Sequence, residues 1–315
     1  MLEILRPGVQ TTVQDLGRHG LRHLGIAQNG ALDAPALILG NRLLGNAANL
    51  AGLEIALGPV EIRFGRDGWF ALTGADFAAT LDGAPAWCGW RLPCRAGQVL
   101  RLSGSRHGMR AYLCVDGGID VPLVLGARAT DLKAGYGGHH GRALQTGDRL
   151  PQGTTVIQLD RRLGVRQRPW QPLLRAIPGP EYHAFDAASR QAFWQQAWTV
   201  SPRSNRMGYR LQGEPLQRKH GGELLSHGVL PGVVQLPPSG QPIVLLADAQ
   251  TTGGYPRIAS VIEADLWLLA QARPGSRLQF VECDIASARA AQEQWLRDWR
   301  RFELAAWGCG QLPPL

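Results

Sequence analysis

Three short segments of this 315-residue sequence gather side chains that can bind anions or transfer protons. Residues 10–18, the first polar segment, place amide, hydroxyl, carboxylate and guanidinium groups within a few positions. The second polar segment, 201–211, holds three arginines beside a glycine. In the third polar segment, 248–257, polar donors and two adjacent glycines follow an apolar run. Because guanidinium groups bind carboxylates and phosphates through paired hydrogen bonds, these segments predict a site for a small acidic molecule.

Each polar segment also has a structural interpretation. The first fits a polar turn in which Asp15 pairs with Arg18, and the pattern alone favours that turn because surface ion pairs are common. The second fits a solvated basic loop equally well. For the third a functional role is favoured, because so polar a run directly after a core strand is hard to explain by packing. Its two glycines predict a backbone nest for an anion.

Several motifs that would localise a cofactor or metal are absent. There is no phosphate-binding loop, and residues 135–141 begin like a dinucleotide fingerprint but place His140 where the third glycine belongs. No zinc-protease or nucleophile-elbow motif occurs, and neither lysine has the Met-Lys-Met surroundings of a biotin carrier. Neighbouring side chains such as His139 and His140 should point to different sides, so we expect no metal site. Any ATP or biotin chemistry must be shared with a partner chain.

Composition and charge exclude several classes of protein. Apolar residues make up 44% and charged residues 18% of the chain, which is typical of a globular protein. The formal charge of +8 comes almost entirely from scattered arginines, with only two lysines, so we expect no nucleic-acid partner. No run approaches the roughly eighteen apolar residues of a membrane span, and the first residues lack signal-peptide order. We expect a cytoplasmic protein that does not contact a membrane.

The cysteines predict free thiols in a reducing compartment. They are odd in number and form no C-x-x-C pair, which argues against a disulfide framework or a zinc site. A local bridge between Cys88 and Cys94 in an oxidising setting is the alternative. The full set is Cys88, Cys94, Cys114, Cys283 and Cys309.

The first half of the sequence predicts strands and turns. Strands are expected at 69–73, 77–81, 84–87, 98–102 and 110–115. Asp82 and Gly83, between two of these, predict a hairpin with a type I′ turn. One helix interrupts the pattern, because Asp33 is a suitable N-cap and Pro35 falls in the first turn.

The second half predicts further strands and three helices. Strands are expected at 173–177, 243–247 and 277–281. One helix should run from the Asp186 cap to Trp198. A second should follow the capping box that Ser260 and Glu263 form, and a long last helix should start at the Asp284 cap.

Many short strands, 40 glycines and 21 prolines are typical of β-barrels, and the length suggests two of them. The arginine- and glutamine-rich stretch 152–172 is interpreted as the crossing between domains.

The three polar segments also carry a family resemblance. Matching text begins with Gly8 to Arg18, Leu53-Glu54-Ile55 and Thr73-Gly74-Ala75-Asp76, and it continues with Asn205-Arg206-Met207-Gly208 and Gln250 to Pro256. Over residues 1 to about 282 the chain resembles the biotin-dependent carboxyltransferase family. Its members are described as the C subunit of 5-oxoprolinase, allophanate hydrolase subunit 2 or the antagonist of a sporulation-kinase inhibitor, and the same module forms part of urea carboxylase.

The resemblance implies a mainly β fold with two cyclophilin-like β-barrel domains, a few short helices and a C-terminal helix. We place the first barrel at 1–160 and the second, with the C-terminal helix, at 161–315. The resemblance further implies a hetero-oligomer of 5-oxoprolinase chains, in which the partners are a kinase-inhibitor-like B subunit together with a further A subunit.

The leading hypothesis is a subunit of an ATP-dependent 5-oxoprolinase, which opens the lactam of 5-oxoproline to glutamate. ATP would be bound by this chain or shared with a partner. One alternative is carboxyl transfer from biotin carried on another chain, as in urea carboxylase. The other is a non-catalytic regulator that binds a kinase-inhibitor homologue.

The candidate site draws on all three polar segments, which we expect to meet in one cleft. The candidate acid/base or orienting carboxylates are Asp15 and Asp248. The candidate substrate- and anion-binding residues are Arg18, Arg206, Arg210, Gln235, Thr251, Thr252, Gly253, Gly254 and Tyr255.

Overall fold

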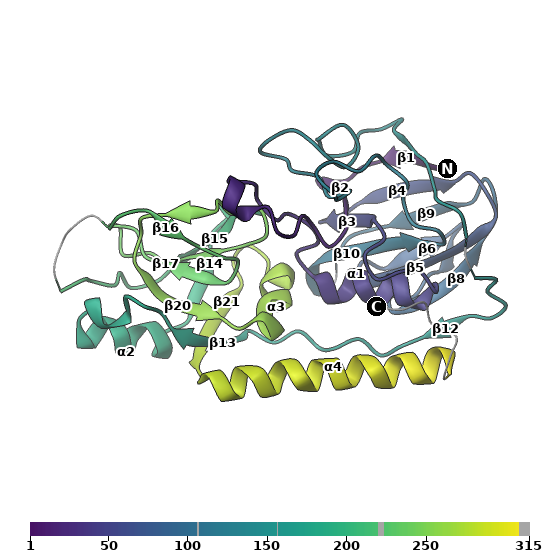
Figure 1. Cartoon of the computed structure of the whole chain (residues 1–315). Coiled ribbons are helices and arrows are strands. Elements are labelled where there is room, and N and C mark those ends of the chain that lie inside the picture. Colours follow the sequence, from purple (N-terminus) through teal and green to yellow (C-terminus); the bar gives the residue numbers. More distant parts are fainter. Residues whose placement is uncertain (106, 156, 220–223, 309–315) are drawn as a thin grey trace. The chain divides into compact units, whose positions relative to one another are not determined.

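Figure 1 shows the chain as a computed structural model, in which residues 1–105, 107–155, 157–219 and 224–308 are described. Strands dominate, seven of them close into a barrel, and a long helix lies near the C-terminus. The predicted fold class is confirmed in these features. Among the described residues, no helix combines the length and the apolar character needed to cross a bilayer.

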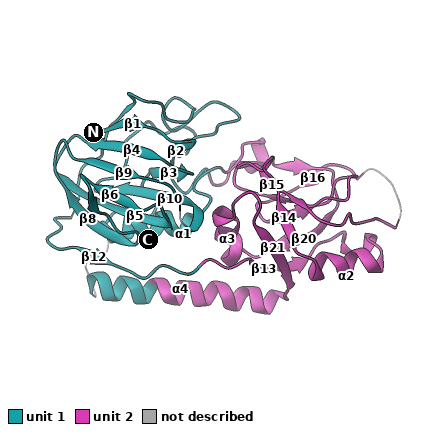
Figure 2. Ribbon diagram, turned by 180° about the vertical axis from the view of Figure 1, so that it is seen from behind, with its two compact units in different colours: residues 1–18, 29–169, 300–315 teal, residues 19–28, 170–299 magenta. Residues whose placement is uncertain are grey.

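The chain divides into two compact units, which Figure 2 distinguishes by colour. The first comprises Met1–Arg18, Asn29–Pro169 and Arg300–Leu315, and the second comprises His19–Gln28 and Trp170–Trp299. Neither unit is continuous in sequence, since each takes a short piece from the other half of the chain. The domain boundary between residues 160 and 161 stays a prediction.

The first unit contains two six-stranded antiparallel sheets. Their inward-facing apolar side chains, such as Leu2, Ile62 and Leu113, form one continuous core. The first sheet has the order β11 (Arg149–Leu150), β1 (Leu2–Arg6), β4 (Val60–Phe64), β9 (Val99–Leu102), β6 (Ala79–Leu81), β7 (Ala84–Pro85). The second has the order β12 (Leu163–Gly164), β8 (Trp90–Cys94), β5 (Gly68–Asp76), β10 (His107–Val115), β3 (Gly52–Ala56), β2 (Gln10–Gln14).

Local signals of the first unit are confirmed. Helix α1 (Ala34–Leu43) is capped by Asp33, whose carboxylate accepts a hydrogen bond from the backbone N–H of Ala36 at 3.0 Å. The helix packs on the outer face of the second sheet, where the Thr73 hydroxyl donates to the Ala36 carbonyl at 2.7 Å. The hairpin between β6 and β7 turns at Asp82 and Gly83, with φ angles of 48° and 86°, as a type I′ turn requires.

The second unit is built on the closed barrel. Its strand order is β13 (Leu173–Pro178), β20 (Arg257–Val261), β17 (Val233–Gln235), β18 (Ile243–Leu245), β15 (Gly208–Gln212), β14 (Trp198–Val200), β21 (Arg277–Glu282). The pair β13–β21 is parallel and closes the barrel, whereas the other neighbours are antiparallel. A separate two-stranded ribbon joins β16 (His227–Gly228) to β19 (Thr252–Gly253).

Short helices flank the barrel. These are η1 (Arg22–Leu24), η2 (Tyr182–Ala184), α2 (Ala187–Gln195), η3 (Glu263–Asp265) and α3 (Leu266–Gln271). Helix α4 (Ile285–Trp307) begins in the second unit and ends in the first. The backbone N–H of Ser287 donates to the Asp284 carboxylate at 2.8 Å, which confirms the predicted start of this helix.

Two helix predictions were wrong at their ends. Helix α2 stops at Gln195, and Trp198 instead opens strand β14, because its indole is fully buried in the barrel. The predicted capping box does not form, since Ser260 lies in β20 opposite Ile177 and no side chain caps η3. In both cases strand pairing within the barrel overrides a local helix signal.

The predicted free thiols are confirmed for Cys88, Cys94, Cys114 and Cys283. Cys88 and Cys94 are therefore not bridged, and Cys309 lies outside the described residues.

Candidate functional site

A buried ion pair joins the second and third polar segments. The Arg206 guanidinium donates to both carboxylate oxygens of Asp248, at 2.9 and 3.0 Å, and both side chains are at least 96% buried. The backbone N–H of Asp248 also donates to the carbonyl of Arg206 at 3.1 Å. Two candidate site residues are thus brought together, with Arg206 occupied by a carboxylate of the chain itself. This pair fixes where the third segment leaves the barrel.

A second bidentate pair holds the other end of the third polar segment. Arg257 donates through Nε and Nη2 to the Glu181 carboxylate at 2.8 and 2.7 Å, and its backbone N–H donates at 2.9 Å. These hydrogen bonds hold the pKa of Glu181 below its usual value. The loop between Asp248 and Arg257 is therefore anchored at both ends by charge-assisted hydrogen bonds.

The glycines of this loop allow close packing. A Cβ on Gly253 would lie 2.7 Å from Nε2 of Gln235, and one on Gly254 would lie 3.0 Å from the Leu224 carbonyl. Neither glycine has a positive φ angle. The backbone therefore does not alternate between right- and left-handed conformations here, as an anion nest requires. Thr252 and Gly253 form β19, and the Thr251 carbonyl accepts from the Val229 N–H at 3.0 Å.

Gln235 lies beneath this loop and is 2% exposed. Its Nε2 is buried without a hydrogen-bond partner among the described residues. The base of the third polar segment therefore contains an amide donor that has no acceptor among the described residues.

The segment His19–Gln28 supplies an arginine that was not selected from the sequence. Arg22 donates through Nη2 to the carbonyls of Val229 and Gln250, at 2.6 and 3.1 Å, so it braces the third polar segment. Burial lowers the pKa of this guanidinium. Because Arg22 lies 228 residues before Gln250, no local sequence pattern indicates this contact.

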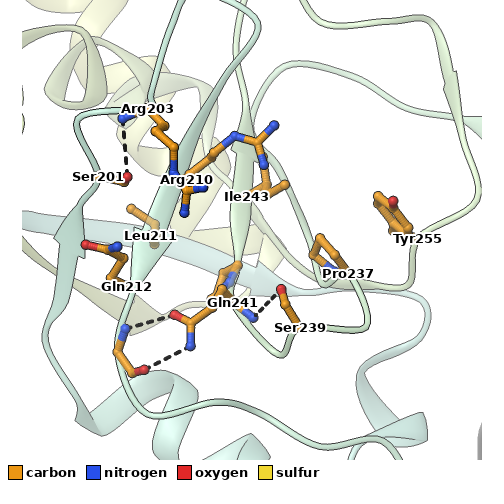
Figure 3. Close-up of a pocket in the computed structure, with 12 residues that line it drawn as sticks. Ser201, Arg203, Arg210, Leu211, Gln212, Pro237, Ser239, Gln241, Ile243 and Tyr255 are labelled. Atoms are coloured by element: carbon orange, nitrogen blue, oxygen red, sulfur yellow. Dashed lines mark hydrogen bonds between the residues drawn. The ribbon is translucent and has the colours of Figure 1, made fainter.

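An open pocket lies on the outer face of the barrel, beside the second and third polar segments (Figure 3). We call it the arginine pocket. It has a volume of about 440 Å³, and its lining includes Arg203, Arg210, Ser239, Gln241, Ile243 and Tyr255.

Strand register explains which side chains reach the arginine pocket. Arg210 lies opposite Ile243, which in turn lies opposite Gln235, so these three side chains form one row across β15, β18 and β17. Their sequence neighbours Tyr209 and Val244 are buried inside the barrel. Because side chains alternate along a strand, the row faces outward. The third polar segment covers Gln235 and leaves Arg210 exposed.

The first polar segment belongs to the first unit and is closely hydrogen bonded. The Asp15 carboxylate accepts from the backbone N–H groups of Gly17 and Arg128, and it is 7% exposed. Arg18 is 1% exposed and donates to the Val124 and Ala129 carbonyls, at 3.1 and 2.7 Å.

Arg18 makes two further contacts. It donates to the Asn29 side chain at 3.0 Å, and its guanidinium lies 4.7 Å from the centre of the Tyr136 ring. Arg18 and Asp15 thus bind separate partners rather than each other, contrary to the polar-turn interpretation. Both fasten loops of the first unit together. Since the other candidate residues belong to the second unit, a cleft common to all three segments stays a prediction.

A buried polar row crosses the second sheet of the first unit. Thr12, Glu54, Tyr112 and Thr73 lie opposite one another on β2, β3, β10 and β5. Tyr112 donates to the Glu54 carboxylate at 2.7 Å, and Arg110 Nε lies 3.4 Å from it. Burial, and next the Glu54 charge, raise the pKa of Tyr112 well above its usual value, so it remains a donor.

Other reactive side chains of the first unit are constrained. Burial raises the pKa of the Cys88 thiol to about 12, which keeps it from acting as a thiolate nucleophile at neutral pH. The rings of His139 and His140 are 4.3 Å apart, so the expectation that they point to different sides was wrong. Within the described ranges, no group of three or more His, Cys, Asp or Glu side chains is arranged to hold a metal ion.

The structure therefore brings together the second and third polar segments and adds residues that were not selected from the sequence. Arg210 and Tyr255 line the arginine pocket, while Arg206 and Asp248 support the loops around it. Arg203, Ser239 and Gln241 were missed as lining residues.

Comparison with known proteins places this arrangement in a family. The family model described as carboxyltransferase domain, subdomain A and B, matches residues 24–282. The chain belongs to this carboxyltransferase domain family. The predicted family is thus confirmed, and the match includes the second and third polar segments in full.

Two full-length relatives of this carboxyltransferase-family chain are named as the C subunit of 5-oxoprolinase. The Escherichia coli protein is 56% identical over 308 residues, which are 98% of each chain. The Haemophilus influenzae protein is 46% identical over 305 residues, covering 96% of this chain and 98% of that one. Among solved structures, Kluyveromyces lactis urea carboxylase aligns with a TM-score of 0.89 at 28% identity, over 100% of this chain and 30% of that protein.

Proposed function

We propose that this chain is the C subunit of an ATP-dependent 5-oxoprolinase, working in the cytoplasm with partner subunits. The observation that carries the proposal is the 56% identity to the C subunit of E. coli 5-oxoprolinase across 98% of both chains. This identity extends over nearly the whole of both chains, whereas the urea carboxylase likeness at 28% is more distant.

The reaction would open a lactam. A lactam is a poor electrophile, and coupling to ATP hydrolysis makes its opening to glutamate favourable. Substrate, product and any phosphorylated intermediate are anionic, so the subunits must present positioned donors. In this chain Arg203 and Arg210 offer guanidinium groups to an open pocket, and the Arg206–Asp248 pair holds the surrounding loops. We propose that ATP is bound by, or shared with, the two partner chains, a kinase-inhibitor-like B subunit together with an A subunit.

The test is reconstitution. We would co-express the chain with candidate A and B subunits, purify the complex and measure glutamate formed from 5-oxoproline and ATP. We expect glutamate only when all three chains and ATP are present. An assembled complex that makes no glutamate would overturn the proposal. A complex that makes it at the same rate without this chain would instead assign the chain a regulatory role.

Carboxyl transfer from biotin is the second candidate. It is favoured by the description of the matching family and by the likeness to K. lactis urea carboxylase. The chain corresponds to 30% of that protein, so biotin and its carboxylation would have to come from other chains. We would supply a biotin carboxylase and a biotinylated carrier and follow transfer of labelled bicarbonate to urea-like acceptors. Transfer that depends on this chain would support this candidate over the first.

A further inference from the structure

Five arginines on or beside the barrel strands of the second unit fall into two groups. Arg175, Arg206 and Arg257 each form a two-pronged pair with a carboxylate, those of Asp265, Asp248 and Glu181. Arg203 and Arg210 are exposed in the arginine pocket, and neither guanidinium has an ion-pair or hydrogen-bond partner in the part of the chain that the structure describes. The pocket lining contains no Asp or Glu. The positive charge of the two guanidinium groups is therefore not neutralised by a side chain of the pocket.

The backbone that carries these two arginines is held in place. The Ser204 hydroxyl accepts from the backbone N–H of Arg210 at 3.1 Å and donates to its carbonyl at 3.4 Å. The Ser201 hydroxyl accepts from the Arg203 N–H at 3.3 Å, as Figure 3 shows. The arginines thus project from a fixed strand end and turn, which lowers the ordering cost of binding a ligand between them.

The opposite wall of the pocket is also fixed. The Gln241 side chain donates to the Gly213 carbonyl and accepts from its N–H, both at 3.0 Å, which joins the turn after β17 to the end of β15. Tyr255 and Pro237 present apolar surface on the far side from the arginines. The volume of about 440 Å³ lies in the lower part of the roughly 300–1,000 Å³ range of small-molecule sites.

We propose that the arginine pocket binds the carboxylate of a small cyclic or short-chain acid through Arg203 and Arg210. The inference deepens the proposed function and rests on it, since 5-oxoproline is an acid of this kind. The planar guanidinium forks suit a carboxylate and would equally receive a phosphate. The small ring of a lactam would then lie against Ile243 and Tyr255, which lack charge. This assigns substrate recognition to this chain rather than to its partners alone.

The first experiment measures binding apart from turnover. We would titrate the purified full chain, alone and in its complex, with 5-oxoproline, L-glutamate, neutral 2-pyrrolidinone and inorganic phosphate, using calorimetry. The variants are Arg203→Gln, Arg210→Gln and both together. The control is Arg277→Gln, an exposed arginine on β21 outside the pocket. Circular dichroism melts confirm that each variant is folded.

We expect 5-oxoproline to bind the natural chain and the Arg277→Gln control equally. Each single pocket variant should bind at least about tenfold more weakly, and the double variant should show no binding, because a charge-assisted hydrogen-bond pair is lost at each site. The neutral 2-pyrrolidinone should not bind at all. Unchanged affinity in the folded double variant would overturn the inference. Phosphate binding more tightly than 5-oxoproline, with the same variant dependence, would overturn the carboxylate assignment.

Steady-state kinetics separate this inference from the proposed function. In a complex that forms glutamate, Arg210→Gln should raise KM about tenfold with kcat changed much less, because the contact is made in both ground and transition states. Full activity with an unchanged KM would sink the pocket assignment and leave the 5-oxoprolinase proposal standing. If a complex that makes no glutamate still binds 5-oxoproline through the pocket arginines, the pocket assignment stands and the 5-oxoprolinase proposal is overturned.

Discussion

The two units carry similar polar rows on the outer faces of their sheets, and they use them differently. In the first unit the row that includes Glu54 and Tyr112 is covered by helix α1 and its cap, and Glu54 is 2% exposed. In the second unit the row that includes Arg210 and Gln235 is covered only over Gln235, and it opens into a pocket at Arg210. One surface is closed by the chain itself, whereas the other remains accessible.

The difference teaches that pairing with a carboxylate, not residue type, separates structural arginines from those that we propose bind a ligand. Arg110 and Arg206 are buried against carboxylates of their own unit, at 3.4 and 2.9 Å. A guanidinium in such a site is desolvated and compensated. Arg203 and Arg210 retain hydration and need no internal carboxylate. The comparison can be tested by changing members of each surface.

Glu54→Gln should have the largest effect on stability. It removes the charge opposite Arg110 and weakens the hydrogen bond from Tyr112, so we expect a loss of about 3–5 kcal/mol in the unfolding free energy of the first unit. Urea denaturation monitored by hydrogen exchange would measure this loss of unfolding free energy. The control is Glu61→Gln, whose exposed pair with Arg101 should contribute less than about 1 kcal/mol. Equal costs at the two positions would refute the description of a closed network.

Asp248→Asn should destabilise the second unit by about 3 kcal/mol, because asparagine leaves the buried Arg206 charge without a countercharge. Adding Arg206→Met should recover part of the loss, since no buried charge then remains. The same denaturation experiment gives both values. If the double variant is less stable than Asp248→Asn by the full cost of a second independent change, the two side chains do not act as a pair.

Asp148 in the first unit should make stability depend on acidic pH. Arg142 donates to both its oxygens at 2.7 and 2.8 Å, and His139 lies 3.4 Å away. Chiefly because of Arg142, the pKa of Asp148 is lowered from 3.8 to about 2.

A lowered carboxyl pKa stabilises the folded state above the unfolded pKa, and the effect is lost as pH falls toward 2. The unfolding free energy of the natural chain should therefore exceed that of the Asp148→Asn variant by about 1–2 kcal/mol at pH 5. That gap should close between pH 4 and 2, as measured by denaturation at each pH. A gap that stays constant with pH would assign the difference to packing.

Arg203→Gln and Arg210→Gln should have the smallest effect, within about 0.5 kcal/mol of the natural stability. Neither guanidinium contacts a carboxylate among the described residues, so nothing buried loses a partner. Thermal melts of the two variants would show this. A loss above about 1 kcal/mol would place these arginines in the supporting structure and erase the contrast between the two surfaces.

Local signals in the sequence predicted local structure well. The Asp33 cap, the Asp82–Gly83 turn and the Asp284 cap all act on neighbours within a few residues, and all three are present. Predictions failed where distant strands competed with such signals. Trp198 continues a helical pattern but is fully buried as a barrel strand. The hydroxyl of Ser260 suits a cap, yet its backbone pairs with Ile177 across the barrel.

The candidate site was predicted at the level of segments. Arg210 and Tyr255 do line a pocket, and Arg206 and Asp248 do meet, but as partners of each other. Arg18 was selected as an anion ligand, whereas its donors bind carbonyls more than a hundred positions away. Arg203 belongs to the second polar segment, yet nothing in the sequence indicated that it, rather than Arg206, would line the pocket.

By itself the sequence determined the family, the mainly β character, the helix caps and hairpins, and the segments in which polar groups concentrate. These follow from residue types and short spacings, which act locally. Only the tertiary structure decided which arginines are neutralised and which face solvent. That outcome depends on carboxylates 42, 76 and 90 positions away, for Arg206, Arg257 and Arg175. Barrel register brings these groups together, and register is a property of the assembled strands rather than of any one of them.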